Sequence, residues 1–328
     1  MAALNSTTPC RLLASHDDAG LLSAAARLPP AATLVTVRDP VARILSAYEF
    51  AVEGAALRLR GEREGERAAP HRGRRRRRRR WSRDATTPPT PVDLVWPWST
   101  LIPWLAEDMR AHGGSPMPLA AFLAAPEVRD TLHEGAALQA LGATSAGTVP
   151  AAAGAAAAVR AACAGPGRAP GAAAVLAAAA TGRLRAAAHV GLAEEVDASV
   201  AAAAGALGWD LGAPPPGRNR TLGQVFRECE ARTAGRAASR RAAAAAALGG
   251  AGPLEGQFPG GRAGVPAELV DAIRGANAAD LAVYEAAKGM LADRLAGLGP
   301  AVARLPAKRA GQQQKKTGQE VGSVRAEL

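Results

Sequence analysis

One short stretch constrains the fold more than any other, because it combines a strand, a turn and a helix. Residues Thr33–Val37 are rich in β-branched side chains, which is typical of a buried strand. Asp39 suits the N-cap of a following helix and Pro40 its first position, where a missing N–H costs nothing. The apolar side chains after them recur at the spacing of one helix face: Val41, Ile44, Leu45, Tyr48 and Val52. The stretch therefore predicts a strand–turn–helix unit of an α/β domain.

A second unit of the same kind is predicted later in the chain. His189–Leu192 reads as a strand, and Ala193–Leu207 reads as a helix with acidic side chains near its start. Residues 266–297 are predicted to be helical as well. We therefore expect one α/β domain over residues 1–298, followed by a polar, disordered tail at 299–328.

Three low-complexity segments interrupt this domain. They cover about 61–95, 143–187 and 213–264, and they are rich in Ala, Gly, Pro and Arg. Such segments hold few large apolar side chains for a core, so they are predicted to be disordered insertions.

The basic charge is local rather than general. The net charge is +11, but thirteen arginines against four acidic residues between Arg58 and Asp84 account for +9 of it. The run Arg74–Arg80 could bind nucleic acid, yet only Trp81 adjoins it and nucleic-acid grooves usually interleave aromatic residues. A disordered, exposed insertion is the favoured interpretation, and no nucleic-acid partner is expected.

Composition excludes several other classes. No run of 18 or more strongly apolar residues exists, so no membrane span is expected, and the first residues lack the pattern of a signal peptide. Cys10, Cys163 and Cys229 are isolated, allow at most one disulfide and lack the spacing of a metal site.

The first strand–helix unit offers a site for a phosphate. A helix N-terminus attracts anions, and Arg38 adds a planar, permanently charged fork at the strand end. Ser46 lies two turns into the helix, roughly 10 Å along its axis, where a long Arg side chain could converge with its hydroxyl. The alternative is that Arg38 pairs with a carboxylate and that Ser46 is a surface hydroxyl.

The segment TVRDPVARILSAY resembles the strand and helix that bind the 3′-phosphate in sulfotransferases using 3′-phosphoadenosine 5′-phosphosulfate (PAPS). Every fixed position of the family pattern RDPxxRxxSxY is present. The resemblance implies that Arg38 and Ser46 contact the 3′-phosphate. It also places Arg43 in the nucleotide-binding motif, where its role could instead be structural.

Further segments, in family order, resemble the plant-type tyrosylprotein sulfotransferases of the heparan-sulfate-sulfotransferase-like group: CRLLASHDD, SAYEFAVEGAALRL, WPWSTLIPWLAEDM, MPLAAFLAAPEVRDTLHEGAALQALG, HVGLAEEVDASV and NAADLAVYEAAKGML. The last segment resembles the pattern N-x-x-D-x-x-LY, with Asn277, Asp280 and Tyr284 in place. The resemblance implies a P-loop-kinase-like parallel sheet flanked by helices. It also implies a Golgi or secretory location and tyrosine hydroxyls in acidic proteins or peptides as acceptors.

The implied reaction is sulfuryl transfer from PAPS to a hydroxyl without a metal. A base that accepts the phenol proton should assist, and His16 is the best candidate, with His133 and His189 below it. The alternative for His16 is a solvated loop residue. Glycan O-sulfotransfer within the same group remains an alternative activity.

One family element is not found. The loop that binds the 5′-phosphosulfate should precede His16, and the residues before it hold no such loop, so we expect an N-terminally truncated chain. A truncated, inactive remnant whose basic insertion binds polyanions is the non-enzymatic alternative. Trp96, Trp98 and Trp104 are predicted to be packing residues rather than part of an acceptor groove.

Overall fold

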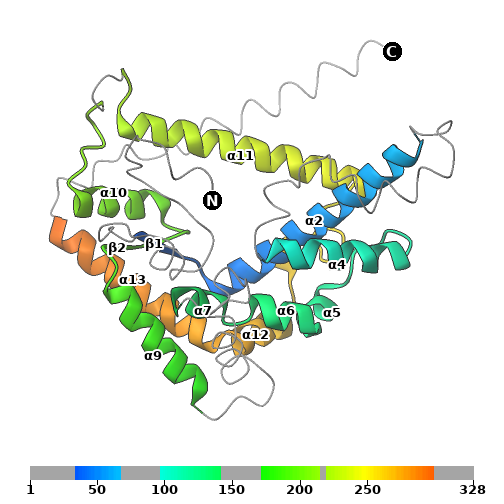
Figure 1. The fold of residues 1–328 in the computed structure, drawn as a ribbon, viewed down its shortest axis with the longest axis horizontal. Coiled ribbons are helices and arrows are strands. Elements are labelled where there is room, and N and C mark those ends of the chain that lie inside the picture. The colour runs from blue at the N-terminus through cyan, green and yellow to red at the C-terminus, as the bar shows by residue number, and fades with distance from the viewer. Residues whose placement is uncertain (1–33, 68–96, 142–170, 215–218, 299–328) are drawn as a thin grey trace, which may run out of the picture.

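A computed structural model describes the chain at residues 34–67, 97–141, 171–214 and 219–298 (Figure 1). Helices account for most of these residues, with two short strands among them. In chain order the elements are β1 (Leu34–Val37), α2 (Pro40–Arg67), α4 (Trp98–Ala111), α5 (Leu119–Ala124), α6 (Pro126–Leu132), α7 (Gly135–Leu141), α9 (Ala172–Arg185), β2 (His189–Leu192), α10 (Val196–Leu207), α11 (Leu222–Ala247), η3 (Gly261–Gly264), α12 (Ala267–Ala276) and α13 (Ala278–Leu298).

The two predicted strands pair with each other. β1 and β2 run parallel, in a register that joins Leu34 to His189 and Val37 to Leu192. All four residues of β2 are buried, as expected for a strand covered on both faces. The described residues therefore form a mostly helical structure around a small parallel sheet, which is compatible with a sulfotransferase-like α/β fold. The wider P-loop-kinase-like sheet stays a prediction.

Helix α2 begins as the sequence predicts. Asp39 caps it by accepting a hydrogen bond from the Ala42 N–H at 2.8 Å, and Pro40 is its first residue. One face is buried over about four turns, with these residues at its core: Ile44, Leu45, Tyr48, Ala51, Val52, Ala55 and Leu59. Val41 packs against the same core while remaining partly exposed.

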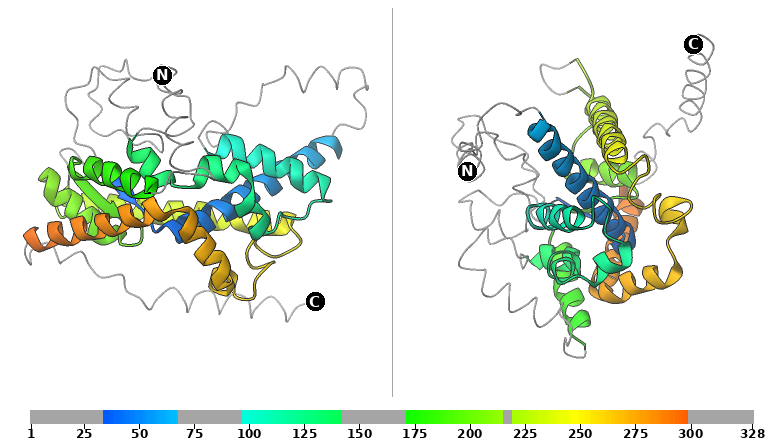
Figure 2. Two further views of the ribbon diagram at one scale, coloured as in Figure 1. Left: turned by 90° about the horizontal axis from the view of Figure 1, so that it is seen from below. Right: turned by 90° about the vertical axis from the view of Figure 1, so that its right-hand side faces the viewer.

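The apolar residues form two clusters. The first packs α2 against α4, α5 and α6, and Trp98 and Trp104 lie at its edge, which confirms a packing role for these two. The second surrounds the sheet with α7, α9, α10 and α13. Figure 2 shows the elements of the two clusters toward opposite ends of the long axis. Because α2 starts at β1 and extends into the first cluster, it connects the two.

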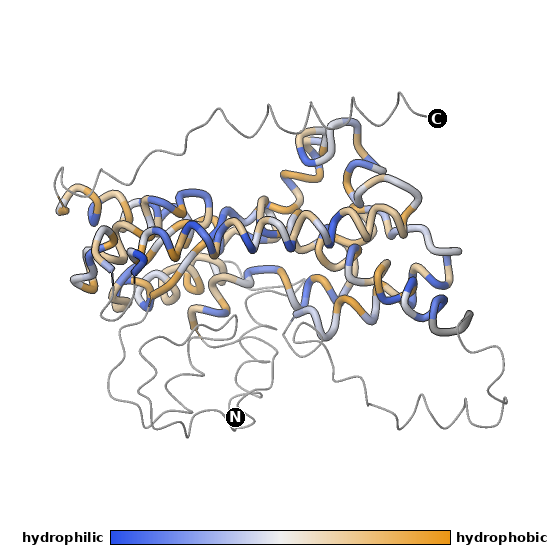
Figure 3. The backbone as a smooth tube through the Cα atoms, turned by 90° about the horizontal axis from the view of Figure 1, so that it is seen from above, coloured by the Kyte–Doolittle hydropathy of each residue, from blue (hydrophilic) through white to orange (hydrophobic). Residues whose placement is uncertain are grey.

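Helix α11 corrects one prediction. Residues 213–264 were expected to be a disordered insertion, but α11 and η3 lie within them. A capping box explains how α11 begins: the Thr221 hydroxyl accepts from the Gln224 N–H, and the Gln224 side chain accepts from the Thr221 N–H. Ala244 is the one fully buried residue of α11, and hydrophilic residues recur along the helix (Figure 3).

Two other predicted insertions are also helical in part. α9 lies inside the 143–187 segment and buries Leu176 and Leu184, because alanine favours helices even where it cannot build a large core. α2 continues to Arg67, into the 61–95 segment, with an Arg60–Glu64 ion pair on its exposed side. The remainder of both segments, the run Arg74–Arg80 and the tail 299–328 lie outside the described residues.

The predicted helix 266–297 is two helices. α12 ends at Ala276 and α13 begins at Ala278, and Asn277 between them has a non-helical φ of −128°.

Candidate functional site

The candidate site lies at the carboxyl edge of the two strands. Because β1 and β2 are parallel and Val37 pairs with Leu192, the residues after both strands emerge at the same edge. The Ala193 N–H continues the pairing by donating to the Val37 carbonyl at 2.9 Å. This brings Arg38 and Glu194 together, although they are 156 positions apart by their numbers.

Glu194 lies against the start of α2. Its Oε1 accepts a hydrogen bond from the Asp39 N–H at 3.1 Å and lies 3.7 Å from the Nε of Arg38. Pro40 has no N–H, and the Ala42 N–H is already bonded to Asp39. Two carboxylates of the protein therefore accept hydrogen bonds from most of the N–H groups at the start of α2. A phosphate at this edge would be bound mainly by side chains.

The Arg38 guanidinium is accessible. Its side chain is 38% exposed, and Glu194 approaches it on the Nε side. A carboxylate partner for Arg38 was one of the two alternatives drawn from the sequence, and the structure supplies one. An exposed pair of this length contributes little stability, so it leaves Arg38 able to bind an anion.

Ser46 lies on α2 and is partly buried. Among the described residues, no hydrogen bond joins its hydroxyl to Arg38. The two residues thus lie on one strand–helix unit without a hydrogen bond between them.

Tyr284 of α13 reaches the same edge. Its hydroxyl lies at hydrogen-bond distance, 3.5 Å, from Oε2 of Glu194. Burial raises the pKa of Tyr284, and the negative charges of Glu194 and Asp39 raise it further, so this hydroxyl is protonated and able to donate. Tyr284 and Arg38 therefore approach different oxygens of the Glu194 carboxylate.

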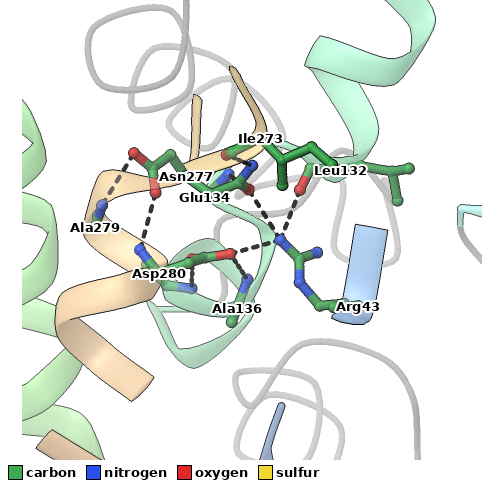
Figure 4. A network of polar contacts seen from close by, with 9 residues as sticks. Arg43, Leu132, Glu134, Ala136, Ile273, Asn277, Ala279 and Asp280 are labelled. Atoms are coloured by element: carbon green, nitrogen blue, oxygen red, sulfur yellow. Dashed lines mark hydrogen bonds and ion pairs between the residues drawn. The ribbon is translucent and has the colours of Figure 1, made fainter. Parts of the chain in front are cut away.

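Arg43 belongs to a separate polar network with Glu134, Asn277 and Asp280 (Figure 4). Its Nη2 donates to the Asp280 carboxylate at 2.6 Å, to the Leu132 carbonyl at 2.9 Å and to the Asn277 side-chain oxygen at 3.1 Å. The structural role that the sequence analysis left open for Arg43 is therefore the one these contacts favour.

Glu134 and Asp280 cap each other's helices within this network. The Asp280 carboxylate accepts from the N–H groups of Ala136 and Ala137 in the first turn of α7. The Glu134 carboxylate, just before α7, accepts from the N–H groups of Ala279 and Asp280 in the first turn of α13. Both carboxylates are fully buried, and each lies at the positive end of a helix dipole.

The three histidines considered as bases lie in different parts of the chain, and the structure describes two of them. His16 lies outside the described residues, so its role stays a prediction. His189 is buried at the amino end of β2, roughly 10 Å along the strand from the carboxyl edge. Burial, with the nearby charge of Arg294, lowers the pKa of His189. His133 follows the last residue of α6, beside the polar network.

Other sequence features are less informative for the site. No group of His, Cys, Asp and Glu side chains in the described ranges is placed to hold a metal ion, and no helix in those ranges could cross a bilayer. Cys229 is an exposed free thiol, whereas Cys10, Cys163 and Trp96 lie outside the described residues.

Two functional neighbours were missed from the sequence. Glu194 was recognised only as an acidic residue near a helix start, and its contact with Arg38 depends on the strand register. Glu134 has a positive φ of 51° directly before Gly135. No sequence pattern predicts this backbone conformation or the role of Glu134.

Comparison with known proteins shows a partial similarity to a tyrosylprotein sulfotransferase. The relative is a protein-tyrosine sulfotransferase of Arabidopsis thaliana, 34% identical over 158 residues. The alignment covers 42% of this chain and 29% of the relative, so the chain spans less than a third of that protein's length. No family model matches the chain, and no solved structure matches it.

Proposed function

We propose that this chain transfers a sulfuryl group from PAPS to the hydroxyl of a protein tyrosine. The observation that carries the proposal is the 34% identity to a protein-tyrosine sulfotransferase. The accessible Arg38, held at the carboxyl edge of a parallel strand pair, supports it, because nucleotide phosphates bind at such edges in α/β sheets.

Arg38 and Ser46 are the proposed 3′-phosphate ligands. The approach of Glu194 to the Nε of Arg38 allows the terminal nitrogens to turn toward a phosphate. Arg is suited to this task, since its planar fork can donate two parallel hydrogen bonds to one anion.

His16 is the proposed proton acceptor. In the reaction the phenol oxygen forms a bond to sulfur, and the bond from sulfur to the 5′-phosphate oxygen breaks. The products are the tyrosine sulfate and 3′-phosphoadenosine 5′-phosphate (PAP), and the phenol proton passes to the imidazole. An acidic peptide as acceptor, and a Golgi or secretory compartment, belong to the same proposal.

Nucleotide binding is the first test. The affinity for PAP is measured by calorimetry for the wild type, Arg38→Ala, Ser46→Ala and the control Arg60→Ala, which changes an exposed arginine of α2. We expect Arg38→Ala to weaken binding about tenfold or more, as loss of a charge-assisted contact does, and the control to leave it unchanged. Unchanged affinity in Arg38→Ala would refute the assignment.

The acceptor is tested separately. The protein is incubated with PAPS and an acidic tyrosine peptide, the same peptide with Phe for Tyr, and a heparan-type glycan. We expect sulfate on the tyrosine peptide alone, and strongly reduced transfer by His16→Ala with PAP affinity retained. Sulfation of the glycan alone would replace the tyrosine proposal with glycan O-sulfotransfer.

A further inference from the structure

Two of the sequence motifs meet in the polar network. Arg43 comes from the RDPxxRxxSxY segment on α2, and Asn277 and Asp280 come from the N-x-x-D-x-x-LY segment at the start of α13. Arg43 lies one turn beyond Asp39, whose carbonyl accepts the Arg43 N–H at 2.8 Å. A side chain one turn from the proposed phosphate site is therefore fixed to a helix distant in sequence.

The donors Nη2 and Nε of Arg43 are directed into the protein. Nη2 makes all three of its hydrogen bonds to protein acceptors, and Nε is buried without a partner. Nη1 lies against Gly135, where an added Cβ would stand 2.6 Å from it. The guanidinium is thus packed between α2, α7 and α13.

Charge explains why a guanidinium is required there. Asp280 and Glu134 have no exposed surface, and Arg43 donates directly to Asp280. A buried carboxylate needs a counter-charge and full hydrogen bonding, and removing one partner leaves an uncompensated charge. Arg43 therefore supplies the counter-charge for Asp280 and, in the same contacts, fixes the first turns of α2.

We propose that Arg43 is a positioning residue of the nucleotide site and does not itself contact the nucleotide. It acts through Asp280 and Asn277, which hold the first turns of α2 so that Arg38 and Ser46 face one ligand. This inference rests on the proposed function, because it assigns a role within that site.

A double-variant cycle separates positioning from contact. Arg43→Met, Asp280→Asn and the double variant R43M/D280N are compared by PAP affinity and by thermal midpoint. Each single variant leaves an unpaired group, so we expect a lower midpoint and about tenfold weaker PAP binding, as a small misplacement of binding groups produces. The double variant removes both charges, so its affinity should rise above that of Arg43→Met toward the wild-type value.

The decisive outcome is the behaviour of the double variant, which lacks the guanidinium altogether. A recovered midpoint with affinity still at the level of Arg43→Met would overturn the proposal, since it would show that Arg43 contacts the nucleotide. A double variant that does not fold also counts against the positioning role. If neither single variant folds, the PAP affinity of the double variant alone decides between positioning and contact. Arg60→Met with Glu64→Gln, an exposed pair on α2, is the matched control and should change neither measurement.

Failure of the proposed function gives a different result. If the wild type does not bind PAP, that function fails, while positioning is still read from hydrogen exchange of the first turn of α2. We expect faster exchange there in Arg43→Met, with protection restored in R43M/D280N. Equal exchange in all variants would overturn the positioning role.

Discussion

Tyr48 offers a direct test of the packing around α2. Its ring is fully buried against Phe122, with ring centroids 5.1 Å apart. Its hydroxyl donates to the Met117 carbonyl at 2.6 Å and accepts from the Gln257 side chain. Burial raises the pKa of Tyr48 to about 12, the negative charge of Glu49 adds to the increase, and the Gln257 hydrogen bond opposes it.

The size of the effect follows from the two pKa values. The pKa rises from 10.0 to about 12, so the folded state favours the neutral phenol by about 3 kcal/mol over the phenolate. A raised pKa contributes stability that is fully present below pH 10 and is lost as the pH rises toward 12. Below pH 10, Tyr48→Phe should instead cost about 1–3 kcal/mol, because it leaves buried polar partners unpaired.

The chain has only two tyrosines, which makes the assay selective. Tyrosinate absorbance is titrated in the wild type and in Tyr48→Phe, which retains Tyr284, and urea unfolding is measured below pH 10 and near pH 12. We expect the wild type alone to show a tyrosine titrating near pH 12. The stability advantage of the wild type over Tyr48→Phe should shrink by up to about 3 kcal/mol over this range. Parallel pH dependences, or a Tyr48 that ionises near pH 10, would refute the reasoning.

Three further substitutions test individual contacts. Gly135→Ala places a Cβ 2.6 Å from Nη1 of Arg43, so we expect the free energy of unfolding in urea to fall by about 1–3 kcal/mol. An unchanged midpoint would show that the guanidinium can move freely. Ser199→Ala removes the buried hydroxyl that bonds both the N–H and the carbonyl of Leu192, and should cost about 1–3 kcal/mol of unfolding free energy; Ser199→Thr, which retains a hydroxyl, is the comparison. Thr221→Ala removes the cap of α11 and should weaken the first turn of that helix by about 1 kcal/mol, visible as faster hydrogen exchange there; equal exchange would contradict the capping role.

The two strands and the helices that follow them were predictable from the sequence, because short stretches of residues define them. The β-branched run before Arg38, the Asp39 cap and the Pro40 start are sufficient to define β1 and the beginning of α2. The second strand and helix were also predicted, because the change from a buried run to helical spacing after Leu192 is local. These features need no knowledge of the rest of the chain.

Composition misled the prediction where it was read without helix propensity. Segments rich in alanine were expected to be disordered because they lack large apolar groups, yet α9 and α11 form in them. Alanine favours a helix through its backbone alone, and a few anchors such as the Arg240–Glu53 ion pair then hold the helix on the surface. A low content of large apolar side chains therefore does not predict disorder in these segments.

The site contacts were beyond reach of the sequence because they join distant segments. The pairing of Arg38 with Glu194 depends on the register of two strands, and that of Arg43 with Asp280 depends on how α2, α7 and α13 pack. The motif identified Arg43 as part of the site, but a motif does not distinguish a ligand contact from a support for one.

The reciprocal capping of α7 and α13 also sets an order of events during folding. Glu134 and the N–H groups of Ala279 and Asp280 are separated by 145 and 146 positions, so these bonds form only once the chain as far as Asp280 is present. While the chain is being synthesised, Arg43 and Glu134 emerge long before Asp280. Until α13 arrives, Arg43 lacks Asp280 and α7 lacks the carboxylate that caps it. We therefore expect consolidation of the region around the proposed site to be a late folding step, because these bonds require long-range closure of the chain.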